Sequence, residues 1–160
     1  MKSARLAWFF GALLLLAACG ERPRDRAAPA EAGPAHVHQA RHGGALAEIG
    51  EEEGHVEFAY GDAPDVLQAY FFDGEMEQYV RVSMPSFSAV AVAAGREYPL
   101  TFVATASTAT GETVGDSALF EAKAGWLADG PALQVTVPAL VIKGRTYAGV
   151  TARLPARPRQ

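Results

Sequence analysis

Residues 45–72 read ALAEIGEEEGHVEFAYGDAPDVLQAYFF, and this stretch decides the fold because it holds three short apolar runs separated by turns. The runs cover residues 45–49, 55–60 and 66–72, and glycines or a proline interrupt the chain between them. Each run has the length of a β-strand and ends at turn residues rather than continuing into a helical repeat. The stretch therefore predicts three consecutive antiparallel strands.

The same pattern continues to residue 154, with glycine or proline between further strand candidates and no convincing helical period. Lys143-Gly144 is typical of a tight hairpin between the last two strands. Strands at short intervals without helices predict an all-β fold, a single antiparallel β-sandwich of immunoglobulin type over residues 45–155, followed by a tail at 156–160. The further strands are expected at residues 79–82, 87–93, 98–104, 118–122, 133–142 and 146–154.

The core of this sandwich is expected to be aromatic, because an aromatic side chain on a strand usually packs against other side chains. We expect Val56, Phe58 and Tyr60 to face the core, since alternate residues of a strand point the same way. His55 and Glu57 then share the opposite side, which is expected to face water. The aromatic residues assigned to the core are Phe58, Tyr70, Phe72, Phe87, Phe102, Phe120 and Trp126.

Composition limits the chain to one domain and argues against nucleic-acid binding. The hydrophobic content of 49% is normal for a globular fold. A chain of 160 residues is too short for two domains of ordinary size. Residues 1–18 contain two basic residues and no acids, so 12 basic and 18 acidic residues follow them, a formal charge of −6. A nucleic-acid partner would require a basic surface instead. The single cysteine excludes an internal disulfide framework.

The N-terminus is typical of an exported protein. Residues 1–18 combine a basic start, an apolar run and small residues, which are the three parts of a signal peptide. The sequence LAAC at residues 16–19 resembles the bacterial lipobox, whose cysteine is lipid-modified and becomes the first residue of the mature chain. The resemblance implies a lipoprotein anchored in the membrane through Cys19. Gly20 follows where an aspartate would imply retention at the inner membrane, so the resemblance favours the outer membrane, facing the periplasm.

Residues 19–35 are expected to form a flexible linker between this anchor and the domain. The stretch from residue 20 to residue 35 has three prolines and no aromatic or branched aliphatic side chain, so it has too little apolar surface to fold. Fully extended, it would span about 50 Å. A histidine-rich segment, residues 36–44, joins the linker to the first strand.

All four histidines lie between residues 36 and 55, which suggests a metal site. Neutral imidazole offers a nitrogen lone pair, and together with carboxylates it suits a borderline ion such as Zn²⁺ or Cu²⁺. If residues 61–65 form a loop, Tyr60 faces Val66 and His55 faces Phe71, close to the carboxylates that follow this strand. The candidate ligands are His36, His38, His42, His55, Glu57, Asp73 and Glu75.

The place of the first three histidines depends on Gly43-Gly44. If these glycines reverse the chain, His38 returns beside Ile49, near His55, and the histidines can share one ion. If the chain runs straight through them, His42 lies about 20 Å from His55 and no common site forms.

These motifs resemble a family of small, largely uncharacterised bacterial exported proteins and lipoproteins with a histidine-rich N-terminus. HGG stands at residues 42–44, Gly50, His55 and Glu57 stand at the place of its GxxHxE motif, and Asp73 ends a strand. Relatives carry a histidine soon after that aspartate, where this chain has Glu75, and glutamate also binds zinc. The resemblance implies a loose link to heavy-metal handling in the envelope and no particular reaction.

Two functions follow from these patterns. The first is a membrane-anchored periplasmic lipoprotein that binds Zn²⁺ or Cu²⁺ for buffering or to support a metal-efflux protein. The alternative is a β-sandwich interaction module of the cell envelope, which binds another protein through a strand edge while its histidines are merely solvated. The chain contains neither GxSxG nor HExxH, so we expect no enzyme.

Overall fold

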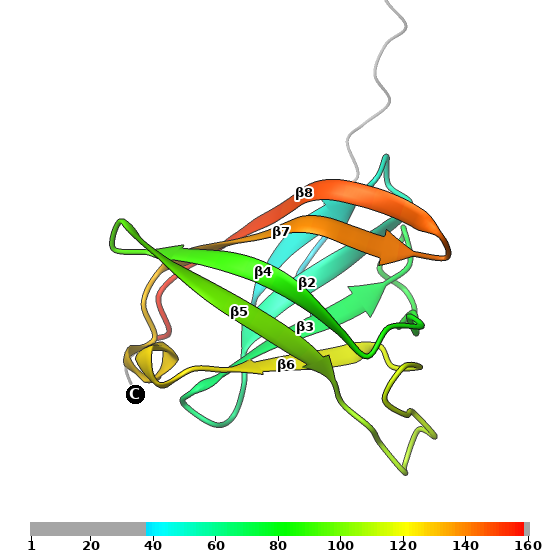
Figure 1. Cartoon of the computed structure of the whole chain (residues 1–160), viewed down its shortest axis with the longest axis horizontal. Coiled ribbons are helices and arrows are strands. Elements are labelled where there is room, and N and C mark those ends of the chain that lie inside the picture. Colours follow the sequence, from blue (N-terminus) through cyan, green and yellow to red (C-terminus); the bar gives the residue numbers. More distant parts are fainter. Residues whose placement is uncertain (1–37, 159–160) are drawn as a thin grey trace, which may run out of the picture. The chain divides into compact units, whose positions relative to one another are not determined.

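This computed structural model describes residues 38–158, which contain eight strands and one short 3-10 helix (Figure 1). The alternation of buried and exposed residues is clearest in β4 and β5, where every second side chain faces the core. The strands are β1 (Ala45–Ile49), β2 (Gly54–Tyr60), β3 (Val66–Phe72), β4 (Ser86–Ala93), β5 (Arg96–Ala104), β6 (Leu119–Lys123), β7 (Leu133–Ile142) and β8 (Arg145–Leu154), and the helix is η1 (Gly125–Asp129).

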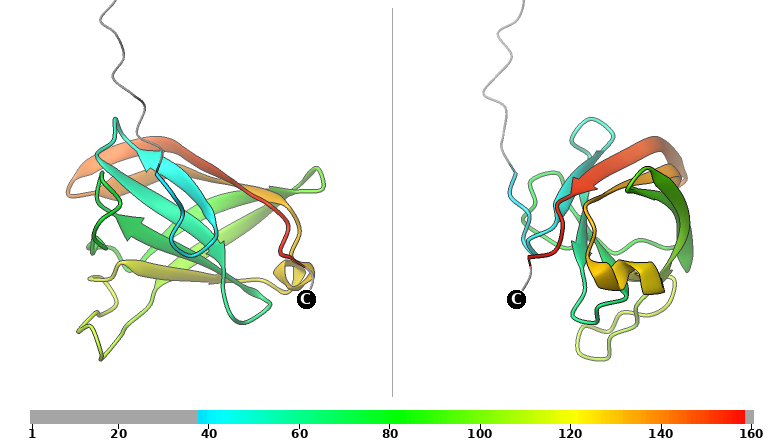
Figure 2. Two further views of the ribbon diagram at one scale, coloured as in Figure 1. Left: turned by 180° about the vertical axis from the view of Figure 1, so that it is seen from behind. Right: turned by 90° about the vertical axis from the view of Figure 1, so that its left-hand side faces the viewer.

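The strands form one antiparallel sheet in the order β1-β2-β3-β6-β5-β4-β7-β8, which confirms the predicted all-β, antiparallel fold. The sheet curls until β1 and β8, its two edges, lie side by side and nearly close a barrel (Figure 2). An eight-stranded sheet can bury its inner face in this way because each strand is twisted against its neighbour. The two layers expected of a sandwich are therefore halves of one curled sheet.

Five phenylalanines pack inside this sheet. Phe87 stacks on Phe102 with 4.9 Å between ring centroids and lies 5.3 Å from Phe120. Phe71 lies 5.4 Å from Phe120, and Phe58 lies 5.5 Å from Phe102. These rings are offset or edge-on, the arrangements that aromatic pairs prefer. Apart from Phe71, all of these phenylalanines were assigned to the core from the sequence.

Of the three other aromatic residues assigned to the core, Trp126 packs against it, whereas Tyr70 and Phe72 lie elsewhere. Tyr70 and Phe72 alternate with Phe71 along β3, so they project from the outer face of the sheet. Phe72 is nevertheless buried, because other residues cover it there. Trp126 is half-buried in η1, where it stacks on Tyr98 at 4.3 Å.

Two sequence-based details were wrong. His55 pairs with Phe72 rather than Phe71, because the Gly61 amide donates to the Val66 carbonyl at 3.0 Å and extends the hairpin by one pair. Residues 79–82 do not form a strand. Within them only two isolated bridges occur, between Phe72 and Tyr79 and between Val82 and Ser117. This segment joins the end of β3 to Ser117, just before β6, instead of adding a strand to the sheet.

Candidate functional site

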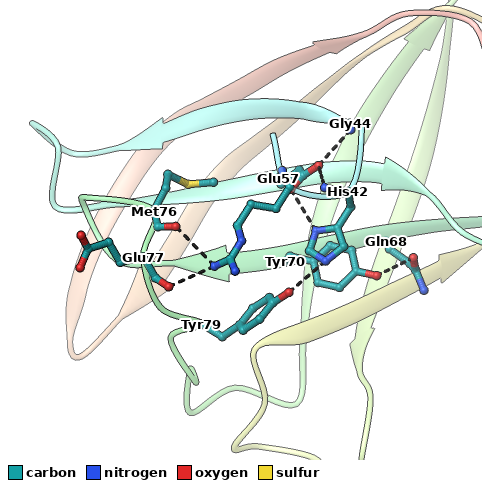
Figure 3. Close-up of polar contacts among 9 residues, drawn as sticks. His42, Gly44, Glu57, Gln68, Tyr70, Met76, Glu77 and Tyr79 are labelled. Carbon is teal, nitrogen blue, oxygen red and sulfur yellow. Dashed lines mark hydrogen bonds and ion pairs between the residues drawn. The ribbon is translucent and has the colours of Figure 1, made fainter. Parts of the chain in front are cut away.

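Residues 38–44, which we call the anchor segment, cover part of the outer face of β2 and β3 (Figure 3). The side of β2 that was expected to face water is buried, with His55 4% exposed and Glu57 fully buried. A charged residue is almost never fully buried unless it is paired. The anchor segment supplies the partners of Glu57, so this face of β2 is a second, polar layer of the structure.

The Glu57 carboxylate accepts four hydrogen bonds from the anchor segment. Its Oε1 atom accepts the backbone N–H groups of His42 at 2.8 Å and Gly44 at 2.9 Å. Its Oε2 atom accepts the backbone N–H of Arg41 at 2.9 Å and the ring Nδ1–H of His42 at 3.0 Å. A carboxylate has about four lone-pair positions, so every one is used. Residues 41–44 therefore wrap around the Glu57 carboxylate, which is not available as a metal ligand.

Gly43 and Gly44 allow this close wrapping. Gly43 has φ of +70°, in the left-handed region that side chains disfavour. Gly44 lies against β2 so tightly that an added Cβ would stand 2.1 Å from the Phe58 carbonyl oxygen. The chain bends back at these glycines, and the ring of His38 comes to 4.6 Å from the ring of His55. The structure thus follows the reversing path of the two considered from the sequence.

The His42 ring is fixed on three sides. It stacks on Tyr70 at 3.6 Å with an interplanar angle of 6°. Its Nδ1 binds Glu57, and its Nε2 lies 3.0 Å from the hydroxyl of Tyr79. Both ring nitrogens therefore have partners within the protein. Burial, together with the nearby hydroxyl of Tyr79, raises the pKa of the Tyr70 phenol above its usual 10.0.

The Arg41 side chain packs over two aromatic rings of this layer, those of Phe72 and Tyr79. Its guanidinium lies 5.6 Å from the centroid of Phe72 and 5.3 Å from that of Tyr79, within cation–π range. It also donates to the Glu77 carbonyl at 3.1 Å and lies 3.5 Å from the Met76 carbonyl. Phe72 is buried beneath these groups.

His55 and His38 form a separate pair at the end of β2. The Nδ1 atom of His55 lies 3.4 Å from the backbone carbonyl oxygen of Asp73. Because a carbonyl only accepts hydrogen bonds, this contact places the proton on Nδ1 and leaves the lone pair on Nε2. Histidines that bind metals commonly donate their second nitrogen to a carbonyl in this way.

The predicted ligand set is therefore divided. His42 and Glu57 bind each other, while His38 and His55 lie together. The side chain of Asp73 accepts the backbone N–H groups of Glu77 at 2.8 Å and Gln78 at 3.2 Å, which makes it the cap of a turn. Glu75 is exposed, and His36 lies outside the described residues. Between residues 38 and 158, no group of three or more His, Cys, Asp or Glu side chains could hold a metal ion.

Sequence reasoning missed Arg41, Tyr70 and Tyr79 as parts of this layer. One signal was present, since β3 carries bulky aromatic residues at the consecutive positions 70, 71 and 72. A strand that is apolar on both faces is typically covered on both faces. The pattern indicated that something packs on the outside of β3, although not which segment.

Comparison of the chain with protein-family models, with curated proteins and with solved structures finds no match. Within the described residues, no helix is long and apolar enough to cross a membrane. The function is therefore inferred from the residues themselves.

The two glycines of the anchor segment provide a matched test of its packing. Gly44→Ala should detach residues 41–44 from Glu57, because its Cβ meets backbone atoms of β2 that cannot move aside. Gly43→Ala meets no atom within 4 Å and should cost only the left-handed conformation, about 1–2 kcal/mol. Thermal unfolding followed by circular dichroism should show a larger decrease in melting temperature for Gly44→Ala than for Gly43→Ala. Equal decreases in melting temperature for the two variants would mean that the close contact of Gly44 with Phe58 does not hold the anchor segment in place.

Proposed function

We propose that the protein is an envelope lipoprotein that binds a divalent transition metal ion, Zn²⁺ or Cu²⁺, through His38 and His55. Its role would be to buffer the ion or to present it to an efflux protein. The observation that supports this proposal is the 4.6 Å separation of the two imidazole rings, with the Nδ1 atom of His55 already directed to a carbonyl.

The ring separation fits a shared ion. A nitrogen–zinc bond of about 2.1 Å places an ion about 3.2 Å from the centroid of each ring. For bond angles between about 90° and 110° at the ion, the two centroids would then be about 4.5–5.2 Å apart. The observed 4.6 Å falls within this range, and the tilt of 56° keeps the rings from stacking face to face.

Two imidazoles leave coordination positions open. Zn²⁺ in proteins usually has four ligands, and a site with open positions takes water or a further side chain. Glu75 is exposed on the turn after β3, and His36 is two residues before His38 in the sequence. These residues are the candidates for a third ligand, and they would tune affinity rather than create the site.

Metal titration of the full chain tests this site. We expect one-to-one binding of Zn²⁺ or Cu²⁺ with a dissociation constant in the low micromolar range or below, measured by calorimetry in detergent at neutral pH. His55→Ala and His38→Ala should each weaken binding by about tenfold or more, because each removes one of two ligands. His42→Asn is the matched control, since His42 is bound to Glu57 and Tyr79, and it should keep wild-type affinity. A dissociation constant that is unchanged in both His38→Ala and His55→Ala would contradict the proposed metal site.

The lipid anchor is a second, independent test. In a bacterial host we expect the wild-type chain to fractionate with membranes and its N-terminal peptide to carry acyl groups on residue 19, whereas Cys19→Ser should be released in soluble form. Fractionation by ultracentrifugation and mass spectrometry of the peptide would measure both. A soluble wild-type protein without acyl groups would contradict the lipoprotein assignment.

One feature of the sheet favours the alternative function, an interaction module. The pairing of β5 with β6 involves only Val103 and Ala104, so residues 96–102 of β5 lack a strand partner on that side among the described strands. Such an edge can accept an added strand from another protein. Partner binding that persists with a chelator and in His55→Ala would favour this function over metal binding.

A further inference from the structure

We propose that Tyr79 is an activated nucleophile, with His42 as its general base and Glu57 as the positioning residue. The group that it would accept is the acyl group of an uncharged carboxylic ester. This site is distinct from the His38 and His55 pair and does not depend on a metal ion.

A continuous chain of hydrogen bonds joins the three side chains (Figure 3). The Glu57 carboxylate only accepts, so the Nδ1 atom of His42, 3.0 Å from Oε2, carries the proton. The Nε2 atom then has the lone pair and accepts the hydroxyl proton of Tyr79 at 3.0 Å. A nucleophile bound to a base that is itself oriented by a carboxylate is the arrangement of acyl-transfer triads, with tyrosine in place of serine.

The base is held rigidly in this position. Tyr70 stacks on the His42 ring at 3.6 Å, and three backbone N–H groups of residues 41–44 bind the same carboxylate that orients the ring. Rigid support matters because a base that is displaced by an ångström loses much of its effect on rate.

The nucleophile is accessible while the carboxylate is not. Tyr79 is 50% exposed, and Glu57 is fully buried. Tyr79 and Tyr70 line an open cleft of about 570 Å³ together with Leu119, which offers apolar surface to an acyl chain or an aromatic ring. The cleft is also lined by two arginines and two glutamates, whose charges balance: Arg41, Arg81, Glu77 and Glu112. Because of this balance we assign an uncharged ester. A hydrogen bond from Thr110 lowers the pKa of Glu112, which keeps this carboxylate charged.

The reaction is an acyl transfer. The Tyr79 hydroxyl oxygen forms a bond to the ester carbonyl carbon while its proton moves to Nε2 of His42. The bond from that carbon to the alcohol oxygen then breaks, and the proton passes from His42 to the departing oxygen. The products are acyl-Tyr79 and the free alcohol, and water can later hydrolyse the acyl group from the tyrosine.

The test uses the full chain in detergent with 4-nitrophenyl acetate, an uncharged activated ester. Nitrophenolate release gives the rate, and peptide mass spectrometry locates the acetyl group. Tyr147 is an internal comparison, because its hydroxyl donates to Glu53 at 2.8 Å without a histidine. We expect Tyr79 to be acetylated about 100-fold faster than Tyr147, the usual contribution of a general base.

Two variants separate this role from a structural one. His42→Asn keeps a short amide donor toward Glu57 and removes the base, so acetylation of residue 79 should fall to the Tyr147 rate. Tyr79→Phe changes an exposed side chain and should abolish the fast release of nitrophenolate. Acetylation of Tyr79 no faster than of Tyr147, or unchanged in a folded His42→Asn variant, would overturn the proposal. If His42→Asn fails to fold, fast release that persists in Tyr79→Phe would overturn it instead.

Discussion

The hydrogen bonds to the buried Glu57 carboxylate are the interaction on which the outer layer of this protein depends. A β-sheet of this kind normally leaves one face to water, and β2 would do so if the anchor segment did not cover it. Without four N–H donors, a fully buried carboxylate would carry a large desolvation penalty. The carboxylate and residues 41–44 thus require each other, and each explains why the other is ordered.

The same bend of the chain produces both candidate sites. Residues 41–44 wrap around Glu57 and place His42 between Tyr70 and Tyr79. Upstream of the bend, His38 returns to the end of β2 and meets His55. The three histidines within residues 38–158, all predicted as ligands of one ion, therefore lie in two different places. His42 belongs to a hydrogen-bonded layer, and His38 and His55 form the pair to which we assign the metal.

Much of the sheet could be predicted because its information is local. β1, β3 and β7 begin and end where the sequence predicted, since glycine, proline or charged residues interrupt the apolar runs at those points. The failures came from details that the pattern of apolar runs does not encode. The pairing of Gly61 with Val66 shifted the register by one, and the curling of the sheet depends on twist accumulated over all strands. The role of Glu57 was unpredictable because its partners are mainly backbone N–H groups, which every sequence possesses.

The stability of Glu57→Gln tests the account most directly. The variant keeps the size of the side chain but replaces one acceptor oxygen with a donor that faces N–H groups. Chemical denaturation should show a loss of about 3 kcal/mol in the free energy of unfolding relative to wild type. Glu48→Gln is the matched control, since Glu48 is exposed and accepts a single bond, from the Glu52 amide at 2.8 Å. It should change stability little, and equal effects of the two substitutions would contradict the central place given to Glu57.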